Sequence, residues 1–281
     1  MSSVSPDQLP ALSDAYALDP SLVGAFRRDG HVTVRGLASE QEVAAYRSAI
    51  ADAVKRLNEE TRPLEERDTY GKAFLQTMNL WEFDEAVARF TLSPRFAGVA
   101  AELLGVDGLR LYHDQALFKE AGGGPTPWHQ DQFYWPLDCP TITMWMALVD
   151  ADSDMGTMNF ASGSQAEGYL RAMKISDESE EYFDRFVQEK GYPVTPTGAL
   201  RAGDATFHAG WVLHSAGPNT SGRMREAMTV IYFADGAQIL KPDHQNRQDD
   251  LERWFPGQKP GEPAGSPINP IVFRRTAARE G

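Results

Sequence analysis

The sequence has little cysteine and no long apolar run. Cys139 is the one cysteine among 281 residues, so an internal disulfide is excluded and a reducing, cytoplasmic compartment is expected. No apolar stretch approaches the ~18 residues that a transmembrane helix needs. The first residues also lack the basic and then apolar pattern of a secretory signal. These absences predict a chain that neither enters a membrane nor carries an export signal.

Positive charge is also scarce. The chain has 27 Lys and Arg against 40 Asp and Glu, a formal net charge of −13. Nucleic-acid binding needs clustered basic residues, so we do not expect a nucleic acid as partner. The 42% hydrophobic content is enough for a real core. We expect residues 1–281 to form a single domain that acts on a small molecule, and nothing in the sequence indicates the oligomeric state.

The first 105 residues are predicted to be mostly helical. Asp19-Pro20 is typical of a helix N-terminus. Ser39 and Glu42 form a capping box, and apolar residues then recur at helical spacing over residues 40–58. Ser93-Pro94 begins another helix. We therefore expect a helical N-terminal layer.

Residues 106–240 are predicted to form a β-rich core. Short strand-like segments alternate with Gly- and Pro-containing turns, a pattern typical of a barrel or a jelly roll. Residues 165–190 interrupt them with a polar, acidic excursion that is expected to be helical and to lie over the rim. The tail, residues 241–281, is rich in Pro and Gly and is expected to be irregular.

A His-x-Asp pair, His129 and Asp131, lies in this β-rich region. On a strand or an extended bend, residues i and i+2 point to the same side, so both side chains can reach one metal ion. Taken alone, the pair is weak, because chance matches in surface loops are common. A second histidine would complete two imidazoles and one carboxylate, the set typical of non-haem Fe(II) oxygenases, which leaves coordination positions open.

Two downstream histidines compete to be the third ligand. We select His214, because Arg225 follows it closely at the start of a predicted strand. His208 stands too far before this arginine and is interpreted as a core residue or a neighbour of the ligands. The planar guanidinium of Arg225 matches the carboxylate of a 2-oxo acid in two hydrogen bonds. Arg223 could do the same, and either arginine could instead lie on the surface beside an acidic residue.

Jointly, these motifs resemble those of the phytanoyl-CoA dioxygenase family of Fe(II)/2-oxoglutarate oxygenases. The matching segments run in family order from about residue 20 to 235 and are Trp128-His129-Gln130-Asp131, Met144 to Leu148, Gly156 to Gly163, Gly203-Asp204, and His214 to Asn219 followed by Arg225. The resemblance implies a mainly β fold, a double-stranded β-helix (jelly roll, cupin-like), beneath the helical layer.

The same resemblance assigns roles to single residues. It implies that Fe(II) is bound by His129, Asp131 and His214 and that 2-oxoglutarate is bound by Arg225. It also suggests further cofactor contacts from Gln115, Trp145, Gln76 and Asn79. In one departure, Ala216 replaces a hydroxyl residue found in some members, so one contact to the co-substrate is missing.

Aromatic residues directly follow the metal motif. Phe133, Tyr134 and Trp135, with Trp81, are candidate substrate contacts, although core or lid packing is the more common role of large aromatics. Aromatic faces attract ammonium groups, and an acidic surface steers cations toward the protein. We therefore expect a cationic or zwitterionic substrate rather than an acyl-CoA.

The expected activity is hydroxylation of a substrate C–H bond with O2 and 2-oxoglutarate, releasing succinate and CO2. A halogenase on the same scaffold would lack the carboxylate ligand, whereas Asp131 is present. A non-oxidative cupin-like metal protein or isomerase would not need Arg225. An acyl-CoA hydroxylase is the third alternative.

Overall fold

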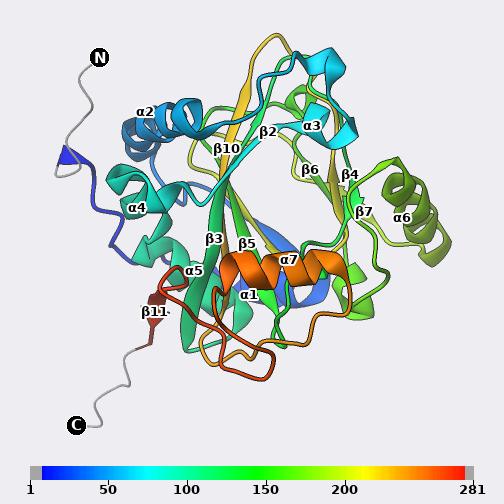
Figure 1. Ribbon diagram of the computed structural model, residues 1–281. Helices are drawn as coiled ribbons and strands as arrows, with labels where there is room; N and C mark the ends of the chain where they lie inside the picture. Colours follow the sequence, from blue (N-terminus) through cyan, green and yellow to red (C-terminus); the bar gives the residue numbers. More distant parts are fainter. Residues whose placement is uncertain (1–7, 276–281) are drawn as a thin grey trace, which may run out of the picture.

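Two antiparallel sheets face each other at the centre of the computed structural model, which describes residues 8–275 (Figure 1). Within that range the larger sheet has seven strands, in the order β1-β8-β5-β10-β3-β11 with β2 also beside β3, and the smaller sheet has the order β4-β9-β6-β7. The strands are β1 (His31–Val34), β2 (Leu75–Met78), β3 (Gly108–Lys119), β4 (Thr126–His129), β5 (Thr141–Ala147), β6 (Met158–Ala161), β7 (Val194–Pro196), β8 (Ala205–Ala209), β9 (His214–Ala216), β10 (Arg225–Ala234) and β11 (Ile271–Arg274). This is the predicted jelly roll.

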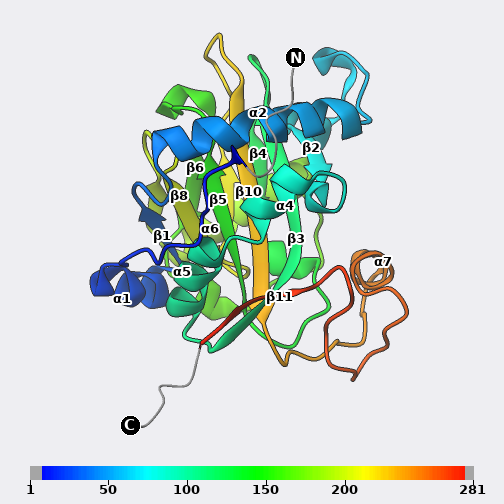
Figure 2. The ribbon, with the colours of Figure 1, turned by 90° about the vertical axis from the view of Figure 1, so that its left-hand side faces the viewer.

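Helices cover the outer face of the larger sheet, as Figure 2 shows. They are α1 (Pro20–Asp29), α2 (Glu40–Leu57), α4 (Glu85–Thr91) and α5 (Pro94–Leu104), and the short α3 (Thr69–Ala73) lies beside β2. Ser39 and Glu42 form the predicted capping box at the start of α2, which fixes where that helix begins. The expected helical layer is therefore present.

Successive side chains of each strand in the larger sheet point to opposite faces of the sheet, one toward the core under the helices and the other toward the space between the two sheets. In β5, Met144 and Met146 pack in the core shared with the helices, while Trp145 lies in the cluster between the two sheets. The side chains that face inward are the ones able to form a site.

The last part of the chain differs from the irregular tail that was expected. It contains α7 (Gln245–Trp254), and β11 extends the larger sheet by pairing with β3. Leu251 and Trp254 are buried against Tyr112 and Phe233, so tertiary packing stabilises a helix whose sequence is mostly polar.

The 165–190 excursion begins in a short 3-10 helix (Ser164–Glu167) and is α-helical only in its second part, α6 (Asp177–Lys190), which packs against β4 of the smaller sheet. Residues 170–176 before it are extended or bent. None of the described helices combines the length and the apolar character needed to cross a membrane.

Candidate metal centre and its cavity

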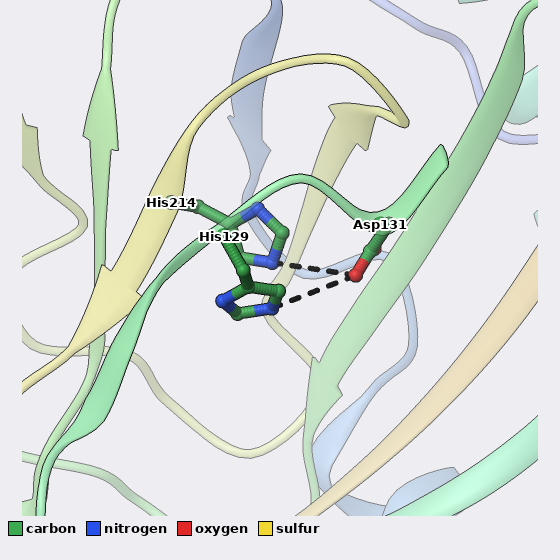
Figure 3. Close-up of side chains that lie close together, drawn as sticks. All are labelled: His129, Asp131 and His214. Carbon is green, nitrogen blue, oxygen red and sulfur yellow. Dashed lines mark ion pairs between the residues drawn. The ribbon is translucent and has the colours of Figure 1, made fainter. Parts of the chain in front are cut away.

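Three side chains that could hold a metal ion meet between the two sheets. His129 ends β4 and pairs with His214 at the start of β9, and Asp131 begins the next turn (Figure 3). The Nε2 atoms of His129 and His214 each lie 3.6 Å from Oδ1 of Asp131. One donor atom from each of the three lies within 4.8 Å of the others. Strand pairing therefore brings together residues that are far apart in the chain.

Backbone carbonyls fix the tautomer of both histidines. Nδ1 of His129 lies 2.7 Å from the carbonyl of Pro127, and Nδ1 of His214 lies 3.1 Å from that of Val212. A carbonyl only accepts, so each Nδ1 carries the proton and each Nε2 presents a lone pair toward Asp131. Burial lowers the pKa of both rings, which keeps them neutral and able to bind a metal ion.

The second oxygen of Asp131 is held by other residues. Thr143 donates its hydroxyl to Oδ2 at 3.1 Å, and Nε2 of His208 lies 3.2 Å from the same oxygen. Burial alone would raise the pKa of this carboxyl, but His214 and the hydrogen bond from His208 outweigh it and lower the pKa. Because His208 donates its Nε2 proton here, that nitrogen has no lone pair for a metal ion. This contact explains why a third histidine lies so near.

The buried cation of Arg225 faces the same cavity. Arg225 is 2% exposed, lines the cavity and lies with its guanidinium 5.1 Å from the centre of the Trp145 ring. It donates to the carbonyl of Gly156 at 2.5 Å, but its Nε has no partner and no described carboxylate pairs with it. Gly156 has φ +70°, and a Cβ there would lie 2.4 Å from the carbonyl oxygen of Gly217. Glycine is therefore required where the backbone meets Arg225.

Lys119 lies directly across from Arg225 in the pairing of β3 with β10. It is fully buried, and its Nζ donates to the carbonyl of Gly124. Burial and then the neighbouring guanidinium lower the pKa of Lys119 to about 6, whereas burial lowers the pKa of Arg225 only to about 9. Arg225 therefore carries the charge of this pair at neutral pH, and an anionic ligand would compensate it.

The cavity that contains these groups has a volume of about 630 Å³. Of the residues predicted to contact the cofactor or the substrate, the lining includes Gln76, Gln115, Tyr134, Trp135, Trp145 and Arg225. Tyr70 donates to Gln76 at 2.8 Å, and Gln76 donates to Gln115 at 2.5 Å, so these side chains form one chain along the wall. Arg223 lies at the surface beside Asp152, which favours Arg225 over this alternative.

Asn79, Trp81 and Phe133 are not among the lining residues, so the structure does not support their predicted contacts. Asn79 accepts a hydrogen bond from the indole of Trp81 at 2.8 Å, on the side of β3 that faces the helices. The ring of Phe133 is buried against His244, with the two ring centres 4.3 Å apart. Of the aromatic run, Tyr134 and Trp135 alone reach the cavity.

Sequence reasoning missed His113, Lys119 and Asp250. His113 and Lys119 lie on β3 an even number of residues from Gln115. Side chains at even separations on a strand share one face, so the predicted position of Gln115 could have indicated both residues. Asp250 lies on α7, where no motif marks it. It lines the cavity because the helix packs against Tyr112 and Trp135.

The fold and the metal site are those of a known class of protein. A model of the family described as phytanoyl-CoA dioxygenase (PhyH) matches residues 26–227. The chain belongs to this family, as its motifs predicted.

Individual relatives share both sequence and fold. L-proline trans-4-hydroxylase of Streptomyces griseoviridis is 25% identical over 228 residues, which cover 74% of this chain and 83% of the relative. The non-heme alpha-ketoglutarate-dependent carbocyclase SnoK from nogalamycin biosynthesis is 26% identical, with a TM-score of 0.75 over 92% of this chain and 97% of its own. The epimerase SnoN, solved in complex with Fe3+, alpha-ketoglutarate and nogalamycin RO, is 29% identical, with a TM-score of 0.71 over 90% and 100%. These similarities confirm the jelly roll.

Proposed function

We propose that this protein is an Fe(II)- and 2-oxoglutarate-dependent oxygenase that hydroxylates a C–H bond of a small molecule and releases succinate and CO2. The observation that carries the proposal is the position of Arg225. This buried cation, without a carboxylate partner among the described residues, opens onto the cavity that also contains His129, Asp131 and His214. A 2-oxo acid with a second carboxylate fits both features at once, and the similar epimerase SnoN was solved with iron and alpha-ketoglutarate.

The donor set suits iron. Two neutral imidazoles and one carboxylate favour Fe(II) and leave positions open for other ligands. Iron bound with 2-oxoglutarate and O2 supplies the oxidising power needed to remove hydrogen from a C–H bond. The protein holds the metal through the two Nε2 atoms and Asp131, while Thr143 and His208 fix the orientation of that carboxylate.

The remaining cavity residues position the co-substrate and exclude water. Arg225 pairs with the far carboxylate of 2-oxoglutarate, and the indole of Trp145 packs beside the guanidinium. Gln76 and Gln115 add polar contacts along the wall. His129, Trp145, His214 and Arg225 are all buried, so charges in this part of the cavity interact with little screening by water.

A different oxidative outcome is the second candidate. Two similar solved proteins are named as a carbocyclase and an epimerase. Each is described as dependent on alpha-ketoglutarate or was solved with it, so proteins similar to this chain are named for reactions other than hydroxylation. The mass of the product separates the outcomes, because hydroxylation adds one oxygen atom, ring closure removes two hydrogens and epimerisation leaves the mass unchanged.

Calorimetry and a substrate screen test the proposal. The Fe(II)-loaded protein should bind 2-oxoglutarate in the absence of oxygen, and candidate substrates should stimulate succinate release in air. Asp131→Ala should eliminate both the metal and the turnover. A wild-type protein that binds iron but not 2-oxoglutarate would instead indicate a non-oxidative cupin-like protein, and strong turnover of an acyl-CoA would favour that substrate class.

A further inference from the structure

The cavity extends well beyond the predicted co-substrate site. Arg225 pairs with Lys119 at one end of β10, and Ile231 pairs with His113 farther along the same two strands. These positions are six residues apart, or about 20 Å at ~3.3 Å per residue. His113 lines the cavity together with Asp250 and Arg253 of α7, and these three residues define the outer end of the cavity, away from Arg225.

A bulge in β3 shapes the outer end. Ile231 pairs with His113 and the next residue, Tyr232, pairs with Leu111, so Tyr112 is the extra residue. Tyr112 therefore turns to the same side as His113 instead of alternating with it, and the two ring centres lie 5.1 Å apart. The Tyr112 hydroxyl then donates to Oδ2 of Asp250 at 2.7 Å. The bulge thus places Tyr112 in contact with both the His113 ring and the Asp250 carboxylate, and these two groups line the same cavity.

His113 presents a hydrogen-bond acceptor. Its Nδ1 lies 3.2 Å from the carbonyl of Asp114, so this nitrogen carries the proton and Nε2 carries a lone pair. The ring is 3% exposed, and Trp254 packs against it with ring centres 4.5 Å apart. Burial lowers the pKa of His113 to about 3, so the ring is neutral and cannot donate from Nε2.

Asp250 presents a carboxyl group to the cavity, and the nearby cation of Arg253 does not form an ion pair with it. Tyr112 occupies one of its oxygens, and no ion pair of Asp250 is found within residues 8–275. The guanidinium of Arg253, one turn along α7, instead lies 4.5 Å from the centre of the Trp254 ring. Burial raises the pKa of Asp250 to about 7, the direction expected for a carboxylate without a paired cation.

We propose that the outer end of the cavity binds a protonated amine of the substrate, with Asp250 as its counter-ion and Nε2 of His113 as a second acceptor. The proposal rests on the proposed function, because it takes the substrate to lie between this end and the metal. Tyr134 and Trp135 line the same cavity and supply aromatic faces, which favour an ammonium group.

The charges around the opening agree with this assignment. Asp68, Asp177 and Asp249 line the cavity beside Asp250, against Lys174 and Arg253. A polyanion such as a coenzyme A thioester would meet more negative than positive charge there. A neutral polyol would satisfy His113 but would leave the charge of Asp250 unpaired.

Matched small probes test the proposal on the Fe(II)- and 2-oxoglutarate-loaded protein without oxygen. Benzylammonium, benzyl alcohol and benzoate have similar shapes and differ in charge. Calorimetry should show benzylammonium binding at least ~10-fold more tightly than benzyl alcohol, since a charge-assisted hydrogen bond contributes ~1.5–3 kcal/mol. Asp250→Asn keeps an acceptor for Tyr112 and should remove that preference. Glu252→Gln removes an exposed charge of the same helix that does not line the cavity, and it should change nothing.

Three outcomes would overturn the proposal. The first is equal binding of benzylammonium and benzyl alcohol by the wild type, and the second is an unchanged preference for benzylammonium in Asp250→Asn. The third is tighter binding of benzoate than of benzylammonium, which would indicate that Arg253 and not Asp250 determines what binds at the outer end. The affinity for 2-oxoglutarate is measured in the same samples. If it is normal while the amine preference is absent, the substrate assignment alone is wrong, whereas loss of 2-oxoglutarate binding by the wild type would refute the proposed function itself.

Discussion

The two ends of the cavity are built from different kinds of structure. At the inner end, every candidate metal or co-substrate residue lies on a strand or directly after one, and strand pairing sets its position. The outer end is formed largely by α3, α7 and residues 174–177, which are held by side-chain packing and by single hydrogen bonds such as those of Tyr112 with Asp250 and of Thr69 with Asp177. We therefore expect residues of the outer end to vary more freely than those of the candidate metal site.

The largest expected effects fall at the inner end. Asp131→Ala, His129→Ala or His214→Ala should lower the affinity for Fe(II) by well over ~100-fold, because each removes one of three protein ligands. His208→Ala removes only the hydrogen bond to Oδ2 of Asp131 and should cost roughly tenfold. Metal titration with Co(II) absorption measures both without turnover. If His208→Ala abolished binding while His214→Ala retained it, the ligand assignment would be wrong.

Arg225→Ala should have the next largest effect. Loss of a buried, charge-assisted contact costs ~2–3 kcal/mol, or about 30- to 150-fold in the affinity for 2-oxoglutarate. Arg223→Ala is the matched control, because its guanidinium is exposed and pairs weakly with Asp152 at 3.4 Å. Calorimetry on both variants checks the ranking, and the reverse order would assign the clamp to Arg223.

The same contrast explains what could be predicted from the sequence. Short-range sequence patterns predicted residues of the inner end, because a His-x-Asp pair on a strand places both side chains on the same face. They also predicted α2 and α5 through caps and spacing. The roles of Gln115 and Trp145 came from the family resemblance, whereas the role of Arg225 was also indicated by its position after His214 and by its guanidinium chemistry. The contacts of all three with 2-oxoglutarate remain predictions.

The outer end could not be predicted, because it depends on long-range packing. α7 has a polar sequence, and its position follows from the burial of Trp254 against Tyr112 and His113. The bulge at Tyr112 leaves no mark in the sequence, since it arises from the pairing of β3 with β10. Asn79 and Trp81 were expected at the cavity, but they lie beside Asp114 on the face of the sheet that packs against the helices.

A pH titration of amine binding tests the outer end more finely. With a pKa of about 7, Asp250 is mostly protonated at pH 6 and mostly ionised at pH 8. Benzylammonium stays protonated throughout, so its affinity should rise roughly tenfold over this interval. Tyr112 and Arg253 face Asp250 along with Asp249 and Tyr134, and the two tyrosines have raised pKa values outside the interval. Asp250→Asn should flatten the profile, and a profile that stayed steep would point to another group.

The smallest expected effect comes from one hydrogen bond at the rim. Tyr134 accepts from the backbone N–H of Ile175 at 3.1 Å and so ties residues 174–177 to the turn after the metal motif. Tyr134→Phe keeps the ring and removes this bond, which contributes ~1 kcal/mol, so hydrogen exchange of the Ile175 amide should accelerate roughly fivefold. Tyr169→Phe, at an exposed tyrosine of the same excursion, is the control. The affinity for 2-oxoglutarate should stay unchanged in both variants, because the inner end is held by strand pairing and not by this segment. If Tyr134→Phe weakened 2-oxoglutarate binding as well, the two ends would be coupled, and the rim would take part in assembling the reaction centre rather than only selecting what reaches it.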